Sequence, residues 1–148
     1  QLAPPAAMKR PDLFTGLIAW APVLNPSRFA AAENGANQFA EAGDPNTREG
    51  FEALLKSDSY QMLPRAKALP DTMIMTGLND RRVSLWMSVK FAARALDQFG
   101  DRSLVLLRTD PEAGHGVGNA RSQSVEQNAD LYSFVLHQAG APGFGPAR

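Results

Sequence analysis

The sequence contains no cysteine, only two histidines, and equal numbers of acidic and basic residues, 15 of each. The absence of cysteine excludes disulfides, thiolate nucleophiles and cysteine-based metal sites. The balanced charge gives no reason to expect nucleic acid or an anionic membrane surface as a partner. Two histidines without acids at ligand spacing predict no zinc site, and we expect no cofactor or metal.

Long apolar runs are also absent, since none approaches the roughly 20 residues that a membrane-spanning helix needs. The first residues, QLAPPAAMKRPDLF, lack the basic segment and the continuous apolar segment of a signal peptide. They do not begin with Met, so we expect a processed or partial chain. With 148 residues and 44% hydrophobic residues, the chain has about the length and composition of one globular domain.

Three short, nearly continuous apolar runs predict strands that are buried on both faces of a parallel sheet. These runs cover residues 17–24, 72–78 and 103–109. Helical periodicity predicts a helix from Thr47 to Lys56, a second between Ser84 and Gly100, and a third from Ser122 or Ser124 to Gly140. The apolar face predicted for the second helix consists of Leu85, Val89, Ala92, Ala93 and Leu96, and that of the third consists of Val125, Ala129, Tyr132 and Leu136.

The alternation of strands and helices predicts an α/β fold with three layers, α/β/α, and a mostly parallel sheet. Residues 1–140 are expected to form one domain, in which residues 25–44 are irregular, and residues 141–148 are expected to form a flexible tail. A sheet of three strands has two exposed edges and too few strands for its helices. We therefore expect this sheet to be part of a larger one.

Two residues that carry chemistry follow neighbouring strands of the predicted sheet. Asp80 comes just after the second strand and His115 just after the third. The carboxyl ends of parallel strands meet at one rim, where α/β sheets bind ligands, so the pair is expected to lie within hydrogen-bonding distance. A carboxylate beside an imidazole suits a general base. Separately, however, Asp80 could be an ordinary turn residue and His115 an exposed loop residue.

Four segments in this order resemble a known family: RPDLFTGLIAWAPVL, GDPNTREGFEALLKSDSY, TGLNDRRVSLWMSVKFAARA and AGHGVG. They are similar to the C-terminal half of the catalytic domain of the prolyl oligopeptidase family of serine peptidases, an α/β-hydrolase fold. The resemblance extends from about Lys9 to Gly140. It implies that Asp80 is the triad acid, that His115 is the general base and that Arg82 binds a substrate carbonyl. The alternative for Arg82, and the preferred interpretation of Arg81, is a surface arginine paired with a carboxylate.

The nucleophile of such a triad has no counterpart in the sequence. α/β-Hydrolases place it in a G-x-S-x-G turn before the acid, and no such motif occurs here. Only Ser27, Ser57 and Ser59 precede Asp80, and none stands between glycines. The resemblance therefore implies that the nucleophile elbow and the N-terminal strands lie upstream of Gln1.

Substrate preference is less well defined. The resemblance implies that a tryptophan after the first strand stacks on the substrate proline, but no tryptophan lies between Ala21 and Leu85. Phe39 is the nearest aromatic candidate, and a core or lid contact is its simpler interpretation. The other large apolar residues, together with a histidine near the end of the last helix, suit structural roles: Trp20, Met73, Met75, Trp86, Met87 and Phe91 in the core, and His137 at the negative end of the helix dipole.

Three classes of function remain open. The chain is part of a serine peptidase that hydrolyses oligopeptides, or a non-catalytic binding or assembly module of the same fold, or part of an esterase-type hydrolase. The peptidase is favoured because a binding module has no physical reason to keep Asp80, Arg82 and His115 in these places. Its expected partners are a peptide substrate and either the N-terminal part of the catalytic domain or another copy of the chain.

Overall fold

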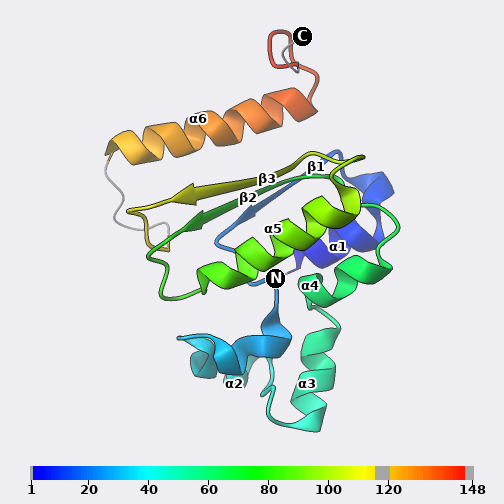
Figure 1. Cartoon of the computed structure of the whole chain (residues 1–148), viewed down its shortest axis with the longest axis vertical. Coiled ribbons are helices and arrows are strands. Elements are labelled where there is room, and N and C mark those ends of the chain that lie inside the picture. The colour runs from blue at the N-terminus through cyan, green and yellow to red at the C-terminus, as the bar shows by residue number, and fades with distance from the viewer. Residues whose placement is uncertain (1, 116–120, 146–148) are drawn as a thin grey trace.

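A parallel sheet of three strands forms the centre of the molecule (Figure 1). The computed structural model describes residues 2–115 and 121–145. The strands are β1 (Gly16–Trp20), β2 (Asp71–Gly77) and β3 (Val105–Asp110), in the order β1-β2-β3. Gly16 is paired with Asp71, and Thr72 with Val105. Because all three strands run in parallel, their carboxyl ends lie at one rim.

Helices cover both faces of the sheet. On one face lie α5 (Leu85–Phe99) and α1 (Ala3–Lys9), and on the other lies α6 (Arg121–Gln138) (Figure 1). The predicted three-layer α/β/α arrangement is therefore confirmed. Short elements fill the connection between β1 and β2 and the approach to β1: η1 (Pro11–Leu13), η2 (Pro26–Ala31), η3 (Gly35–Gln38), α2 (Phe39–Ala42), α3 (Arg48–Leu55), α4 (Ser59–Met62) and η4 (Leu63–Arg65). No helix among the described residues is long and apolar enough to cross a membrane.

Of the three strands, β2 alone shows near-complete burial along its length, because it has a neighbour on each side. β3 is only partly buried, and Leu106 is exposed. β1 ends at Trp20, four residues earlier than predicted, because Ala21 has a positive φ of 42° and Pro22 lacks an N–H for the ladder. Trp20 was expected in the core but is 45% exposed, since β1 is an edge strand of the described sheet.

The helix boundaries follow the sequence signals in part. Thr47 caps α3, and its side chain accepts a hydrogen bond from the N–H of Gly50. Ser84 occupies the N-cap position of α5 without a side-chain cap bond, and Gly100 follows its last residue. The cap predicted for the third helix was wrong, because α6 begins at Arg121 and includes both candidate serines. Residues 25–44 contain no long element, but their short helices were not predicted.

The buried face of α5 differs from the predicted one. Val89 and Leu96, both assigned to the core, are 42% and 50% exposed. The face toward the sheet carries larger side chains: Met87, Ser88, Phe91, Ala92, Ala95 and Phe99. Burial of these residues removes more apolar area from water than burial of the predicted stripe would. Met87 and Phe91 were correctly expected in this core, and Trp86 packs at its margin.

The buried face of α6 was also predicted wrongly. Val125 and Tyr132 are 60% and 61% exposed, and Leu136 is 37% exposed. The stripe toward the sheet consists of Gln127, Leu131, Phe134 and Gln138, which follow the i, i+4, i+7, i+11 spacing of one helical face. Phe134 and Leu131 pack against Met73 and Met75, which fill space as expected. Both ends of the stripe are glutamines, so hydrophobic periodicity did not reveal it.

A buried polar network anchors the connection between β1 and β2. The carboxylate of Asp58, fully buried, accepts hydrogen bonds from the side chain of Asn25, from the backbone and side chain of Ser27, and from the N–H of Gln61. Lys90 on α5 donates to Asn25 Oδ1 at 3.1 Å. The network ties residues 25–61 to the core, so this segment is irregular in path but fixed in place.

Candidate active site

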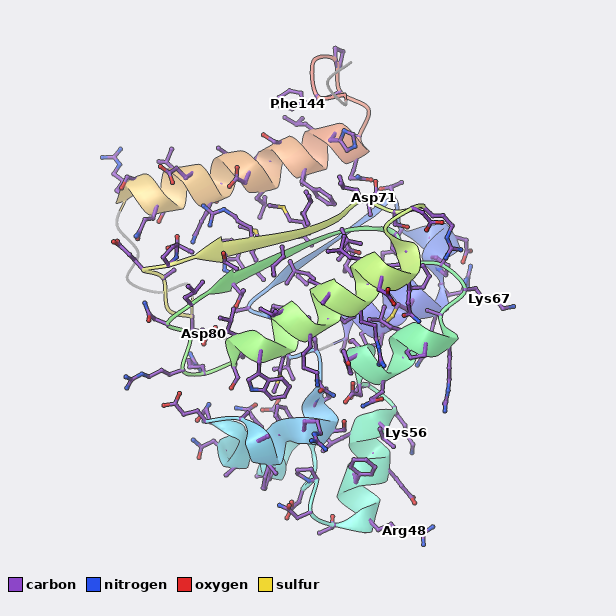
Figure 2. The ribbon with its side chains drawn as sticks, viewed as in Figure 1. Arg48, Lys56, Lys67, Asp71, Asp80 and Phe144 are labelled. Carbon is purple, nitrogen blue, oxygen red and sulfur yellow. The ribbon has the colours of Figure 1, made fainter. Side chains whose placement is uncertain are left out.

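Asp80 lies in the turn that follows β2, at the carboxyl rim (Figure 2). Its side chain is fully buried. Its Oδ1 accepts hydrogen bonds from the backbone N–H groups of Arg82 and Val83, both at 2.9 Å. Asp80 therefore shapes its own turn, as the simpler interpretation of this residue predicted. The other carboxylate oxygen remains for a second partner.

That second partner is His115. Its Nδ1 lies 2.8 Å from Oδ2 of Asp80, so the prediction that the two residues lie within hydrogen-bonding distance is confirmed. A carboxylate accepts and does not donate, so the geometry requires the proton on Nδ1. Nε2 then carries a lone pair and can accept a proton. The imidazole is 29% exposed, which leaves it accessible from the rim.

The loop that carries His115 rests on the turn that carries Asp80. Asn79 donates from its backbone to Ala113 O at 3.1 Å and from its side chain to Pro111 O at 2.9 Å. Gly77 allows this approach, because a Cβ there would lie 2.2 Å from Ala113 O. Only glycine fits so close a contact. The second glycine of the AGHGVG motif, Gly116, lies outside the described residues.

A cavity of about 350 Å³ opens beside His115. It lies between the carboxyl end of β1 and the start of α1, and its lining is mostly apolar: Ala3, Pro4, Ile18, Ala19, Trp20, Ala21, Pro22, Val23 and Val83. The exposed indole of Trp20 belongs to this lining, as does Ala21 with its positive φ. The cavity lies at the carboxyl end of β1, next to the imidazole.

Arg81 and Arg82, the two arginines of the turn, were interpreted as possible partners of surface carboxylates. Both Arg81 and Arg82 are exposed. Neither forms an ion pair with a carboxylate of the described residues, so the paired surface arginine expected for Arg81 is not observed. The backbone of Arg82 is held on both sides, by its N–H to Asp80 and by its carbonyl, which accepts from Asn34 Nδ2 at 3.5 Å. These two bonds hold the backbone of Arg82 in place at the turn.

None of the serines that precede Asp80 is presented at the rim. Ser27 is buried and its hydroxyl donates to Asp58. Ser57 donates to the carbonyl of Leu54 at 3.3 Å, and Ser59 is fully buried in the first turn of α4. No serine before Asp80 is therefore in place to act as the nucleophile.

Phe39 packs against the main core cluster, in agreement with the simpler interpretation of this residue. His137 takes no part in the rim, because its Nδ1 lies 2.7 Å from the carbonyl oxygen of Phe144. Lys90 had no expected role, yet its ammonium also lies over the rings of Tyr60 and Trp86, with distances of 4.3 and 5.2 Å to the ring centroids. Among the described residues, no group of three or more His, Asp or Glu could hold a metal ion.

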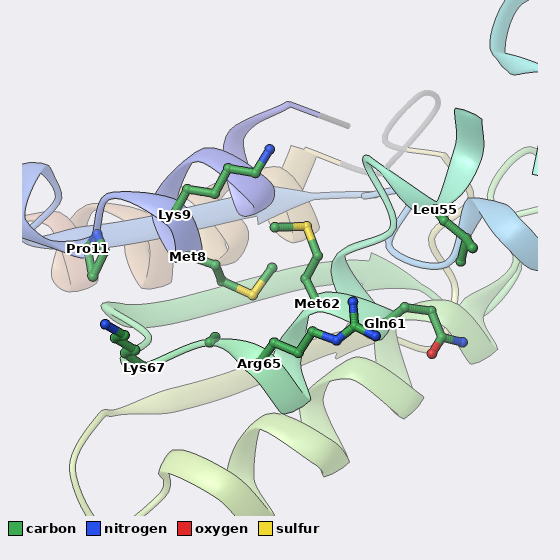
Figure 3. A pocket seen from close by; sticks show the side chains of 9 residues that line it. Met8, Lys9, Pro11, Leu55, Gln61, Met62, Arg65 and Lys67 are labelled. Atoms are coloured by element: carbon green, nitrogen blue, oxygen red, sulfur yellow. The ribbon is translucent and has the colours of Figure 1, made fainter. Parts of the chain in front are cut away.

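A larger cavity, of about 560 Å³, lies away from the rim (Figure 3). Its lining comes from segments that lead into β1 and β2 and includes Met8, Met62 and three cations, Lys9, Arg65 and Lys67. Met8 belongs to the main core cluster and Met62 packs against that cluster. Because His115 and Asp80 lie after the strands and this lining lies before them, the cavity is at the opposite end of the sheet from the pair.

Comparison with known proteins identifies the family. The model of the prolyl oligopeptidase family matches residues 2–142. The chain belongs to this family. It is 34% identical over 104 residues to dipeptidyl aminopeptidase BI of Pseudoxanthomonas mexicana, which covers 70% of this chain and 14% of that protein. It is 33% identical over 135 residues to prolyl endopeptidase of Elizabethkingia miricola, which covers 88% of this chain and 19% of that protein.

Solved structures agree. Oligopeptidase B from Trypanosoma brucei matches with a TM-score of 0.81 and 27% identity over 91% of this chain and 19% of that chain. Oligopeptidase B from Leishmania major matches with a TM-score of 0.83 and 25% identity over 91% of this chain and 19% of that chain. The family is one of serine peptidases with an α/β-hydrolase catalytic domain, and this chain spans about a fifth or less of the relatives' length.

Proposed function

We propose that the chain supplies the acid and the general base of a serine peptidase, Asp80 and His115, to a serine that lies outside residues 1–148. The observation that supports this most directly is the bond of 2.8 Å between Asp80 Oδ2 and His115 Nδ1. The bond leaves Nε2 as the atom that removes the proton from the serine hydroxyl. The imidazolium that forms then gives this proton to the leaving amine, while the carboxylate of Asp80 stabilises its charge.

The surroundings of the pair suit this role. Oδ1 of Asp80 is occupied by two backbone N–H groups, which hold the carboxylate in one orientation. The cavity beside His115 lies between the carboxyl end of β1 and the start of α1, and this is where we place the serine. The guanidinium of Arg82, anchored by its backbone, binds a carbonyl of the substrate.

The substrate is an oligopeptide. The relatives named above carry different names, dipeptidyl aminopeptidase, prolyl endopeptidase and oligopeptidase B, so the family alone does not select a cleavage site. The segment after β1 offers no tryptophan on which a proline could stack, and Phe39 is engaged in the core. A preference for proline is therefore not part of the proposal.

The test uses the longer protein that contains residues 1–148 together with the segment proposed to bear the nucleophile. His115→Ala should abolish hydrolysis of peptidyl p-nitroanilides, whereas His137→Ala, the matched control at the other histidine, should leave it unchanged. A p-nitrophenyl ester assayed in parallel separates an esterase, which would cleave the ester alone. Full peptidase activity in the His115→Ala protein would contradict the proposal, and no hydrolysis of either substrate by the parent would favour a binding module.

A further inference from the structure

Asp110, the last residue of β3, is buried and forms a set of bonds that the peptidase chemistry does not use. Its side chain is at the carboxyl rim and the residue is only 7% exposed. Oδ1 accepts the backbone N–H groups of Glu112 and Ala113, each at 3.1 Å. Oδ2 accepts a hydrogen bond of 3.2 Å from Nε2 of Gln127 on α6. The carboxylate thus joins a loop, a strand end and a helix.

The bonds to Oδ1 decide the path of the loop that leads to His115. They close a turn directly after β3, in the same way that Oδ1 of Asp80 closes the turn after β2. The turn brings Ala113 O to the N–H of Asn79, which is the residue before Asp80. The carbonyl of Asp110 itself accepts from the N–H of Leu78 at 2.9 Å. These bonds therefore fix the turn after β3 in position relative to the turn after β2.

His115 stands two residues after this anchored position. Within residues 2–115 and 121–145, the side chain of His115 has one hydrogen-bond partner, Asp80. The imidazole is therefore placed by that bond together with the path of residues 110–114. A bond of 2.8 Å tolerates little displacement, because hydrogen bonds weaken steeply with distance and angle. If the turn after β3 opened, Nδ1 would move away from Asp80.

The bond from Gln127 also ties α6 to the end of β3. Its counterpart lies at the other end of the helix, where Gln138 donates to Asp71 Oδ2 at 2.8 Å. Asp71 also accepts a backbone N–H, that of Leu104, at its Oδ1. Asp71 and Asp80 lie at opposite ends of β2 (Figure 2). Asp71, like Asp110, accepts a backbone N–H at one oxygen and a glutamine side chain at the other, but far from the rim, and it serves as the control. Asp110 in addition lies near a cation, with Nη1 of Arg108 3.8 Å from its Oδ2.

We propose that Asp110 is a positioning residue for the general base: it sets the turn after β3 and thereby holds His115 in the Nδ1–H tautomer against Asp80. The inference rests on the function proposed above for its catalytic consequence, but the effect on His115 is a property of the chain itself. Displacement of a catalytic group by about 1 Å can lower a rate on the order of 100-fold.

The experiment follows the ¹⁵N resonances of the imidazole rings by NMR, at about pH 8.5, where an ordinary imidazole is neutral. The chain has two histidines, so His137→Gln assigns the signals. The parent should show His115 as the Nδ1–H tautomer, with a hydrogen-bonded ring proton that exchanges slowly. Asp110→Ala should abolish that proton signal and mix the tautomers. Asp110→Asn, which retains the acceptor at Oδ1, should restore both.

Asp71→Ala should leave the signals of His115 unchanged, even if it lowers stability as much as Asp110→Ala. If Asp110→Ala does not fold, Asp110→Ser decides, because serine closes such turns more weakly. An unchanged His115 in Asp110→Ala, or in Asp110→Ser when the alanine variant is unfolded, would overturn the inference, as would an equal effect of Asp71→Ala.

In the active protein, Asp110→Ala should lower kcat on the order of 100-fold with little change in KM, and Asp110→Asn should recover most of it. The two proposals remain distinguishable. Loss of the tautomer in Asp110→Ala together with full peptidase activity in His115→Ala would refute the proposed function alone. An unaltered tautomer in Asp110→Ala, with His115→Ala inactive, would refute the role of Asp110 alone.

Discussion

His115 Nδ1 lies 2.8 Å from Asp80 Oδ2, although 35 residues separate the two in the sequence. The contact arises because β2 and β3 are parallel neighbours, so that the residues after each strand meet at one rim. Asp80 both closes its own turn and orients the imidazole, one function for each carboxylate oxygen. The interpretations of Asp80 as a turn residue and as the partner of a base are therefore compatible.

Asp80→Asn should be far more damaging to turnover than Arg82→Ala in the active protein. Asparagine keeps the turn but offers an N–H₂ group or a weaker acceptor to His115, so the required tautomer is lost and kcat falls by about four orders of magnitude. Loss of one hydrogen bond from a charged group to the substrate costs roughly 1.5 to 3 kcal/mol, on the order of 10- to 100-fold. Steady-state kinetics of both variants checks this, and small, equal effects would reduce Asp80 to a turn residue.

Gly77→Ala should separate the two loops of the site. Its Cβ would lie 2.2 Å from Ala113 O and 2.4 Å from Gly114 O, so the loop that carries His115 must shift. We expect a loss of about 1 to 3 kcal/mol in the free energy of unfolding, measured by urea denaturation, and loss of the bond to Asp80. Gly114→Ala is the control, because its nearest neighbour would be 3.8 Å away. Similar behaviour of the two variants would contradict this packing.

The sequence predicted the parts of this arrangement that depend on local pattern. Short apolar runs identified all three strands, and the rule for parallel strands brought Asp80 and His115 together. The sequence pattern did not, however, predict which faces of α5 and α6 are buried. On α6 the buried stripe begins and ends with glutamines, whose burial is tolerated because Asp110 and Asp71 accept their hydrogen bonds. Such partners are known only once the strands and the helix are placed together.

Trp20 shows the same dependence on tertiary context. A tryptophan within a continuous apolar run is expected in the core. In the part of the chain that the structure describes, β1 pairs with β2 alone, and Trp20 lines the cavity beside His115. No role was predicted for Asp110 from the sequence, although its place at the end of β3 is close to that of Asp80 just after β2 and is a signal that could have indicated it.

Asp58→Ala should strongly destabilise the segment between β1 and β2. The carboxylate is fully buried and accepts hydrogen bonds from Asn25, Ser27 and Gln61, so its removal leaves several buried donors without a partner. Each unsatisfied group costs roughly 1 to 3 kcal/mol, and we expect a total loss of at least about 3 kcal/mol in urea denaturation. Asp101→Ala, at an exposed ion pair, should change stability by less than about 1 kcal/mol. Comparable losses would argue against the network.

Residues 1–148 expressed alone should associate. β1 is an edge strand of the described sheet, and Trp20 is exposed at its end, so the edge is a template for pairing with another chain. Trp20→Lys should shift the chain toward monomer in sedimentation velocity, because a charge at an edge opposes pairing. Phe51→Lys, at an exposed position on α3, is the control and should not. A stable, folded monomer of the unaltered chain would show that this edge does not drive association.

The central claim is that this chain provides the acid and the base but not the nucleophile. A fluorophosphonate that labels active serines, followed by peptide mapping of the active protein by mass spectrometry, tests it most directly. We predict one labelled serine outside residues 1–148, no labelling of residues 1–148 alone, and loss of the label in His115→Ala but not in His137→Ala. Stoichiometric labelling of any serine within residues 1–148, or full labelling in His115→Ala, would contradict the account.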